Sequence, residues 1–240
     1  MAWRSGNPDD SDDAHYGEKE RSMDCKRQKY QRLEEASYKR NRFAISDAEQ
    51  LLESSWFGDL KAVKRLLRKG VPPTSRSKRH LTFHPNSTPL MAAAQNGHLE
   101  VAKLLLSWGS KVEATDDYGH TALMWSVWSN EPSVPMVALL LRKGGNPNRH
   151  GNGGWTPLIR AAKYGHPEIV RLLLRYGADA TARASNGEPA LHFAKLHADL
   201  PQNVACVRLL APELDDAGPT SMSAAALIEH YEKLEGAGMM

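Results

Sequence analysis

A phrase of eight residues recurs along the chain and constrains its fold more than any other feature. Its copies occupy residues 87–94, 120–127, 155–162 and, in a weaker form, 188–195. Residues 88, 121, 156 and 189 hold the same place in each copy, and they are separated by 33, 35 and 33 residues. A period of about 33 residues indicates a stack of repeated structural units, in which one unit cannot bury its apolar side alone.

A second phrase keeps step with the first. It runs over residues 58–70, 97–109 and 165–177, and its ending returns at residues 137–144. Each full copy opens on a glycine, continues with a leucine-rich run and closes on another glycine. Because glycine commonly ends helices, each repeat is expected to hold two helices separated by a short turn.

The first phrase carries the signals of a helix start. Thr88, Thr121 and Thr156 stand where an N-cap hydroxyl is wanted, and Pro89 and Pro157 follow at the first helical position. The alanines that come next keep the first helix thin, so that neighbouring repeats can approach closely. The leucines of the second helix are expected to fill the space between the layers.

Together these phrases resemble the ankyrin family over roughly residues 47–216. The resemblance implies an all-α solenoid of helix–turn–helix repeats joined by β-hairpin fingers, with about five repeats and a C-terminal half-repeat cap. We expect the ankyrin-repeat domain to span residues 47–236, with repeats at about 47–86, 87–118, 119–153, 154–186 and 187–217 and the cap at 218–236.

Residues 1–46 lie outside the repeat. The first part of this N-terminal arm is acidic and polar, and residues 18–42 are strongly charged with no glycine or proline. Three interpretations of the second part stay open: a solvated or transient helix, a segment that becomes ordered on a partner, and a patch for nucleic acid or nuclear import. We expect an arm that is largely disordered or partly helical.

In the ankyrin family, partners usually bind the concave surface formed by the fingers and the exposed positions of each first helix. Although the chain is only 7% aromatic, several aromatic residues map to this surface. Exposed Trp and Tyr residues are frequent hot spots of interfaces. The alternative is that several of them pack between repeats, as we expect of Trp125 and Phe193. The predicted contact residues are Trp56, Phe57, Tyr118, His120, Trp128, Trp155, Arg160, Lys163 and Tyr164.

The connection between the first two repeats is longer than the others. Its extra residues lie in 71–86 and include Arg76, Lys78 and Arg79, so it predicts an enlarged basic finger that contacts an acidic partner or is a solvated insertion. His80 and His84 have no cysteine or carboxylate nearby in sequence that could complete a zinc site, and we expect no metal.

The sequence offers no phosphate-binding loop, nucleophile elbow or metal-binding helix in a suitable context. We therefore expect no enzyme, no catalytic residue and no cofactor. The favoured function is a protein-binding scaffold or adaptor, whose partner is unidentified and carries acidic and apolar anchors. The alternatives are a nucleic-acid-associated protein that uses the arm and the basic finger, and a structural subunit of a larger assembly. Lacking a secretory signal or an apolar run of about 18 residues, it is expected in the cytoplasm or nucleus.

Overall fold

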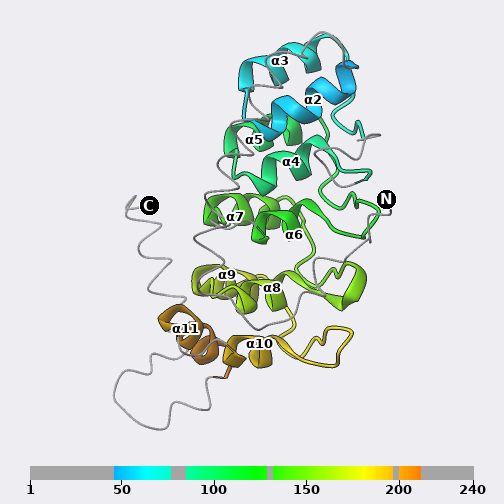
Figure 1. The fold of residues 1–240 in the computed structure, drawn as a ribbon. Coiled ribbons are helices and arrows are strands. Elements are labelled where there is room, and N and C mark those ends of the chain that lie inside the picture. Colours follow the sequence, from blue (N-terminus) through cyan, green and yellow to red (C-terminus); the bar gives the residue numbers. More distant parts are fainter. Residues whose placement is uncertain (1–45, 77–84, 129–131, 197–199, 212–240) are drawn as a thin grey trace, which may run out of the picture.

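The structure is a computed structural model that describes residues 46–76, 85–128, 132–196 and 200–211. Within these ranges the chain forms five pairs of helices that stack in chain order (Figure 1). The pairs are α2 (Asp47–Trp56) with α3 (Leu60–Arg68), α4 (Pro89–Gln95) with α5 (Leu99–Ser107), α6 (Ala122–Val127) with α7 (Val134–Arg142), α8 (Pro157–Lys163) with α9 (Pro167–Arg175), and α10 (Ala190–Leu196) with α11 (Pro201–Leu210). A short 3₁₀ helix, η1 (Asn152–Gly154), lies in one connection. The expected all-α solenoid is confirmed.

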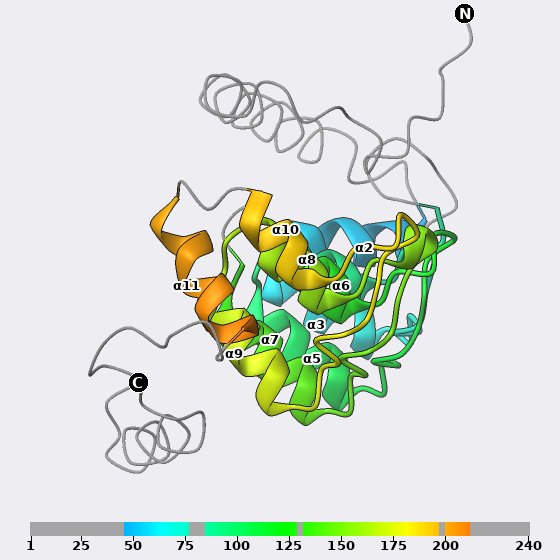
Figure 2. The ribbon, with the colours of Figure 1, turned by 90° about the horizontal axis from the view of Figure 1, so that it is seen from below.

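The helices form two rows. The first helices, α2, α4, α6, α8 and α10, each contact the next one along the stack, and the second helices, α3, α5, α7, α9 and α11, form a parallel row behind them. Seen along the stack, the connections between repeats project together from one edge (Figure 2). One long face of the molecule is therefore made by the first helices and the connections beside them.

The connections are hairpin-shaped turns tied to one another. Each of the last three is closed by one backbone hydrogen bond across its base: Asp116 N–H to His120 O at 3.1 Å, Gly151 N–H to Trp155 O at 3.3 Å, and Ala184 N–H to Glu188 O at 3.0 Å. Neighbouring turns are joined by bonds such as Asn152 N–H to Tyr118 O at 2.8 Å. In the described residues these bonds form no continuous strand, only an isolated antiparallel bridge between Arg183 and Pro189.

Three of the first helices begin as the sequence predicts. The hydroxyls of Thr88, Thr121 and Thr156 accept hydrogen bonds from the backbone N–H groups three residues on, at 3.3, 3.4 and 3.2 Å. In α2, Ser46 takes this role and forms a capping box with Glu49. Each cap satisfies an N–H group that has no partner inside the helix, which contributes about 1 kcal/mol.

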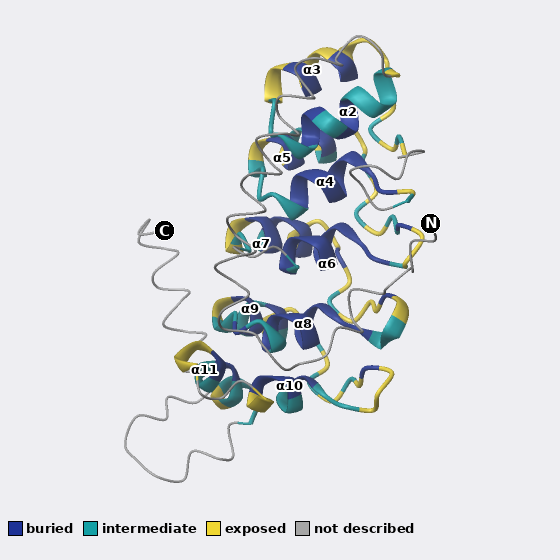
Figure 3. Cartoon of the chain, in the orientation of Figure 1, coloured by how far each residue is buried: buried dark blue, intermediate teal, exposed yellow. Residues whose placement is uncertain are grey.

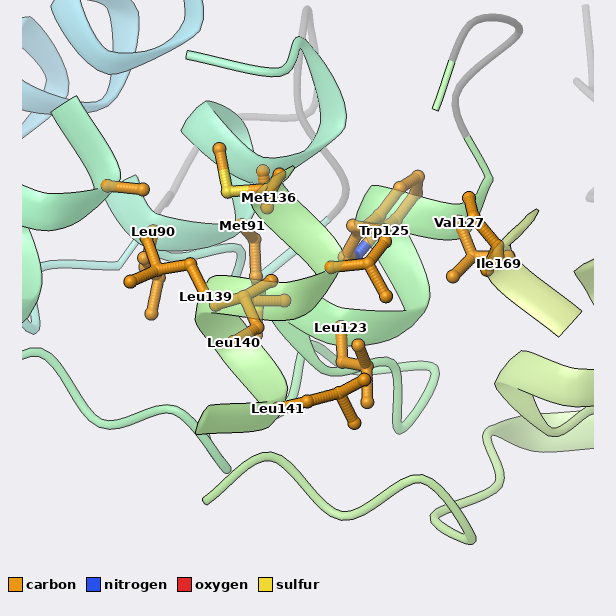
Figure 4. Packing of buried hydrophobic residues seen from close by; sticks show 14 of the residues in the cluster. Leu90, Met91, Leu123, Trp125, Val127, Met136, Leu139, Leu140, Leu141 and Ile169 are labelled. Atoms are coloured by element: carbon orange, nitrogen blue, oxygen red, sulfur yellow. The ribbon is translucent and has the colours of Figure 1, made fainter. Parts of the chain in front are cut away.

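The apolar core runs through the stack between the two rows (Figure 3). Alanines 92–94 of α4 are fully buried, which confirms that this helix is thin and lies close to its neighbours. Buried apolar residues of the first helices, such as Met91 and Leu123, form one cluster with Met136, Leu140 and Leu141 of α7 (Figure 4). Most of this apolar surface is covered by other repeats, so stability depends on stacking.

The inner turns of the first and fourth repeats are each covered by a residue of the next repeat. Gly165 ends the α8 turn at φ +68°, and a Cβ there would lie 2.5 Å from Oδ1 of Asn203, whose amide donates to the carbonyl of Ala162 at 3.3 Å. Gly58 at φ +73° is covered in the same way by the His98 ring. A side chain at either glycine would be strained and would also separate the repeats.

Several predicted features fall outside the described residues. They are the arm up to residue 45, residues 77–84 of the basic finger with Lys78 and Arg79, and the cap at 218–236. In the part that the structure describes, no helix is long and apolar enough to cross a membrane.

The turn histidines generate a prediction about pH. Nε2–H of His98 donates to the carbonyl of Trp56 at 2.8 Å, and burial lowers the pKa of His98 from 6.5, an effect that this bond only partly offsets. Burial likewise lowers the pKa of His166. As pH falls through 6.5, the unfolded imidazoles bind protons and the folded ones do not, so stability present above this value is lost.

We expect the melting temperature of the wild-type chain to fall between about pH 7.5 and 5.5, and to fall by less in the variant His98→Gln/His166→Gln, in which this linkage is removed. Thermal melts followed by circular dichroism at both pH values measure this difference. An equal loss in both proteins would contradict the assignment.

Candidate functional site

Equivalent positions of the repeats form rows along the face of the first helices, which we call the first-helix face. Counting five residues on from the leucine shared by every first helix gives Trp56, Gln95, Trp128, Lys163 and Leu196. The first four are half-buried and Leu196 is 51% exposed, whereas the residues just before them in α4, α6 and α8 are buried. We call these five residues the ridge row, because they are the more exposed residues at the ends of the first helices.

Trp128 occupies the middle of the ridge row and is held by two groups. Its ring stacks on that of Trp125, with the centroids 4.8 Å apart and the planes at 14°. The guanidinium carbon of Arg160 lies 3.7 Å from the Trp128 ring centroid. A stacked aromatic pair and a desolvated cation–π contact together fix the orientation of this side chain.

Arg160 brings a positive charge into the interior at 1% exposure. Its Nη2 lies 3.5 Å from Nε2 of His120, a residue of the preceding connection that is itself buried at 4%. Because a guanidinium only donates hydrogen bonds, Nε2 of the neutral imidazole is the acceptor here. This assignment places the imidazole proton on Nδ1, which lies 3.3 Å from Oδ2 of Asp116.

Asp116 is the anion that offsets this buried cation. Its Oδ1 accepts the backbone N–H groups of Tyr118 and His120 at 2.9 and 2.8 Å, and its Oδ2 accepts Nε1–H of Trp125 at 3.0 Å. Burial alone would raise the pKa of Asp116, but the hydrogen bonds from His120 and from the Trp125 indole outweigh it and lower this pKa. The carboxylate therefore stays ionised and ties a connection to α6.

Trp155 extends the cluster toward the last described repeat. Its ring lies 4.8 Å from that of Phe193 in α10, and only 8% of its surface is exposed. The Arg160 guanidinium and the Lys163 ammonium lie 5.6 and 5.1 Å from the Trp155 ring centroid. Lys163 is thus held over an aromatic ring, half-buried, with no carboxylate within ion-pair distance among the described residues.

The predicted contact residues separate into two groups. Trp56, Phe57, Trp128, Lys163 and Tyr164 are half-buried, and Tyr118 is exposed at 37%. His120, Trp155 and Arg160 were expected on the concave surface, but they are buried. Phe193 of the next repeat covers the Trp155 ring, and Trp128 and Trp155 cover the Arg160 guanidinium. The expected exposure of His120, Trp155 and Arg160 is therefore wrong. Trp125 and Phe193 are buried, and Phe193 packs against Trp155 of the preceding repeat as expected.

Sequence reasoning missed Asp116, although a signal was available. A buried indole N–H nearly always finds an acceptor, and Asp116 stands in the connection that leads directly into the helix of Trp125. With Trp125 predicted to be internal, an acidic residue of that connection was the natural candidate.

The basic finger is described only at its edge. Arg76 is exposed, and its Nη1 donates to the carbonyls of Asn86 and Thr115 at 2.9 and 2.7 Å, so it links its own connection to the next one. Lys78 and Arg79 lie outside the described residues. The described ranges contain no group of three or more metal-ligating side chains, and burial raises the pKa of the Cys206 thiol to about 12.

Known proteins share this architecture at the level of sequence. The profile of a family described as "Ankyrin repeats (3 copies)" matches residues 51–151 and 130–221, which is more than half of the chain. A Dasypus novemcinctus protein named "Ankyrin repeat, SAM and basic leucine zipper domain-containing protein 1" is 33% identical over 125 residues, 51% of this chain and 25% of that protein.

Two further relatives carry different names. "Probable E3 ubiquitin-protein ligase XBOS33" of Oryza sativa subsp. japonica is 31% identical over 144 residues, which is 60% of this chain and 27% of that protein. "26S proteasome non-ATPase regulatory subunit 10" of Dictyostelium discoideum is 38% identical over 81 residues, 34% of each chain. The chain spans only about a quarter to a third of the length of these curated relatives.

The buried carboxylate generates a prediction about stability. Asp116→Ala leaves two backbone N–H groups and the Trp125 indole N–H without their acceptor, and we expect a loss of about 3 kcal/mol or more in the free energy of unfolding. The matched control is Asp117→Ala, whose exposed carboxylate accepts a hydrogen bond from Asn86; it should cost less than about 1 kcal/mol. Urea unfolding measures both, and equal losses would contradict the role given to Asp116.

Proposed function

Because the chain belongs to the ankyrin-repeat family, whose repeats generally mediate protein–protein interaction, we propose that it is a non-catalytic scaffold or adaptor that holds a partner protein on the first-helix face. Members of the family are typically scaffolds without catalytic activity. The proposal for this chain concerns the particular surface and the side chains that contact the partner.

The observation that carries the proposal is the support of Trp128. The large aromatic side chain of Trp128 stays partly accessible at the centre of the face, while Trp125 and Arg160 contact it from within. Tyr118 adds an exposed ring beside it, 6.0 Å from the ring of His120. A rigid aromatic group loses little conformational entropy on binding, so more of its burial energy is available for affinity.

The buried residues of the cluster have an indirect part in this proposal. The connection before α6 is joined to helix α8 through Asp116, His120 and Arg160. These contacts fix the distance between the third and fourth repeats on the face. The Trp155 ring forms a cation–π contact with the Lys163 ammonium. We propose that these groups position the contact residues and do not themselves touch the partner.

The names of the relatives do not extend this proposal. One is named as a ubiquitin ligase and one as a proteasome subunit, but the shared part is a fraction of each of those proteins. The nucleic-acid alternative rests on the arm and on Lys78 and Arg79, all outside the described residues, and the described Arg76 donates to backbone carbonyls. Protein binding is the function that the described residues support best.

The test compares two pairs of aromatic side chains. A partner is first identified by affinity purification and mass spectrometry, then purified, and its affinity for the full chain is measured by calorimetry. We expect Trp128→Ala/Tyr164→Ala to weaken binding by about 30-fold or more, as loss of a hot spot worth ~2 kcal/mol implies. Tyr118→Ala should weaken it as well, with little effect on folding because this side chain is already exposed.

The matched control is Trp108→Ala/Tyr176→Ala, which removes two exposed aromatic side chains at the ends of α5 and α9, on the second row of helices. This variant should bind as the wild type does. Circular dichroism melts check that all variants are folded. Unchanged affinity in folded Trp128→Ala/Tyr164→Ala, or an equal loss in the control, would rule out the first-helix face as the binding surface.

A further inference from the structure

The last described repeat keeps apolar residues at places that are fully buried in the other repeats. Helices α10 and α11 form one end of the described stack (Figure 1). The equivalent of the shared leucine in α10, Leu191, is only half-buried. In the four earlier repeats this leucine is at most 1% exposed, at Leu51, Leu90, Leu123 and Leu158. Each of these four first helices contacts the first helix of a following repeat, and among the described residues α10 has no such neighbour.

The second helix of this repeat shows the same difference. The run Val-Arg-Leu-Leu occurs in α9 at residues 170–173 and in α11 at residues 207–210, which aligns the two helices. Val207 and Leu210 are half-buried. Their equivalents in the four earlier repeats are at most 2% exposed: Val63, Leu66, Ala102, Leu105, Val137, Leu140, Val170 and Leu173. We call Leu191, Val207 and Leu210 the end patch, because their places are fully buried in every described repeat that another repeat follows.

The two ends of the described stack differ in polarity. Phe193 of α10 packs against Trp155 of the preceding repeat, and Glu53 of α2 holds the same repeat position with no described repeat before it. Arg65 of α3 is likewise charged and exposed at a place where the later second helices have leucine. The first repeat is therefore polar where a preceding repeat would pack, whereas the end patch is apolar. Because the terminal repeats of a stack need a polar outer side, the end patch calls for a covering element.

The residues around the end patch indicate the chemistry of such a cover. Lys195 is exposed and lies one helical turn beyond Leu191, on the same side of α10. His192, the other polar residue on this part of α10, has a partner in its own repeat, since its Nδ1 lies 3.3 Å from Oε2 of Glu188. An apolar patch beside a lysine suits a helix that has small apolar residues on one side and acidic residues next to them.

Residues 218–236, which follow α11 in the chain, have these properties. The phrase that begins the first helices returns there as Thr220, Met222 and the alanines at 224–226, with the spacing found in α4. The same segment has three glutamates and one lysine. The match to the family profile also continues to residue 221, beyond the described residues. The sequence therefore predicts one more first helix, with acidic residues on its polar side.

The segment is close enough in sequence to reach the end patch. Thr220 follows Ala211, the C-cap of α11, by nine residues. Nine residues can span up to about 30 Å at ~3.3 Å per residue, whereas packed helices lie only about 8–10 Å apart. Because the segment belongs to the same chain, its effective concentration at the end patch is on the order of millimolar, well above that of a second copy in dilute solution.

We propose that residues 218–236 of this chain pack on the end patch as a sixth step of the stack, made of a single helix. Ala224 holds the place that Phe193 has in α10, so the alanine side of the segment faces the end patch. Leu227 then takes the next place in the ridge row after Leu196, and the segment adds an apolar step to the first-helix face. This inference does not depend on which partner that face binds.

The test compares the reactivity of one thiol on the end patch with that of a thiol outside it. Both are introduced into the full chain with Cys25→Ser. Leu191→Cys places a thiol on the end patch. Arg208→Cys places one on the exposed side of α11, where the equivalent Lys103 is exposed even inside the stack. Labelling by iodoacetamide is followed over time by mass spectrometry.

We expect the thiol of Leu191→Cys to react at least about tenfold more slowly than that of Arg208→Cys, because a covered thiol is shielded from the reagent. The remaining native thiol reports global unfolding: Cys206 is fully buried, and burial raises its pKa to about 12. Rates are compared under conditions in which Cys206 stays unlabelled.

Two further variants decide whether the segment is the cover. Ala224→Asp/Ala225→Asp places two charges on the alanine side, and it should make the thiol of Leu191→Cys react as fast as that of Arg208→Cys. The matched control, His230→Asp/Lys233→Asp, also adds two aspartates to the segment, but on its polar side. This control should keep the slow reaction.

Three outcomes would overturn the proposal. Equal rates for Leu191→Cys and Arg208→Cys in the otherwise unchanged segment would mean that the end patch is open. A slow reaction that persists in Ala224→Asp/Ala225→Asp would mean that something else covers it: a second copy if the protection increases with protein concentration, and another part of the chain if it does not. Equal loss of protection in both aspartate variants would rule out packing by the alanine side.

Discussion

The contact between neighbouring repeats is the interaction on which the rest of the structure depends. A pair of helices such as α4 and α5 has apolar residues on the sides that face the repeats before and after it, so it can bury them only within the stack. Small residues at 92–94 let the first helices approach, and the inner turns then interlock: Asn203 reaches back to the carbonyl of Ala162, and His98 to that of Trp56. Substitutions at these points act on two repeats at once.

The same stacking produces the first-helix face. Since equivalent positions lie one above another, the choice of one residue per repeat forms a row along the molecule. The buried network of Asp116, His120 and Arg160 links two neighbouring repeats beneath that row. Burying charges costs solvation energy that pairing only partly returns, so this network is weak evidence for extra stability. The network has a specific structural effect: it holds the Trp128 ring in place and connects helix α8 to the connection that precedes α6.

The fold could be predicted because its signals are local. The period, the threonine caps and the glycine turns each depend on a few adjacent residues, and helix starts were correct at Thr88, Thr121 and Thr156. The burial of individual face residues could not be predicted in this way, because it depends on the repeat next door. Trp155 is covered since residue 193 is a phenylalanine, and Arg160 is buried since Trp128 and His120 receive it. The position of a residue in the motif predicts the direction of its side chain. The exposure of that side chain depends on which residue the adjacent repeat places against it.

On a face built from repeats, the side chains must determine the register in which an elongated partner would bind. Every step presents nearly the same backbone, so an elongated partner could shift by one repeat and meet the same helix geometry. Trp56, Gln95, Trp128, Lys163 and Leu196 differ in chemistry from each step to the next. For a partner with the acidic anchor that the sequence predicts, a shift by one repeat would move that anchor from Lys163 to Trp128 or Leu196, where its desolvation would be uncompensated. If the first-helix face binds a partner as proposed, the register of that partner would depend on unfavourable contacts at the wrong repeats as well as on favourable contacts at the right one.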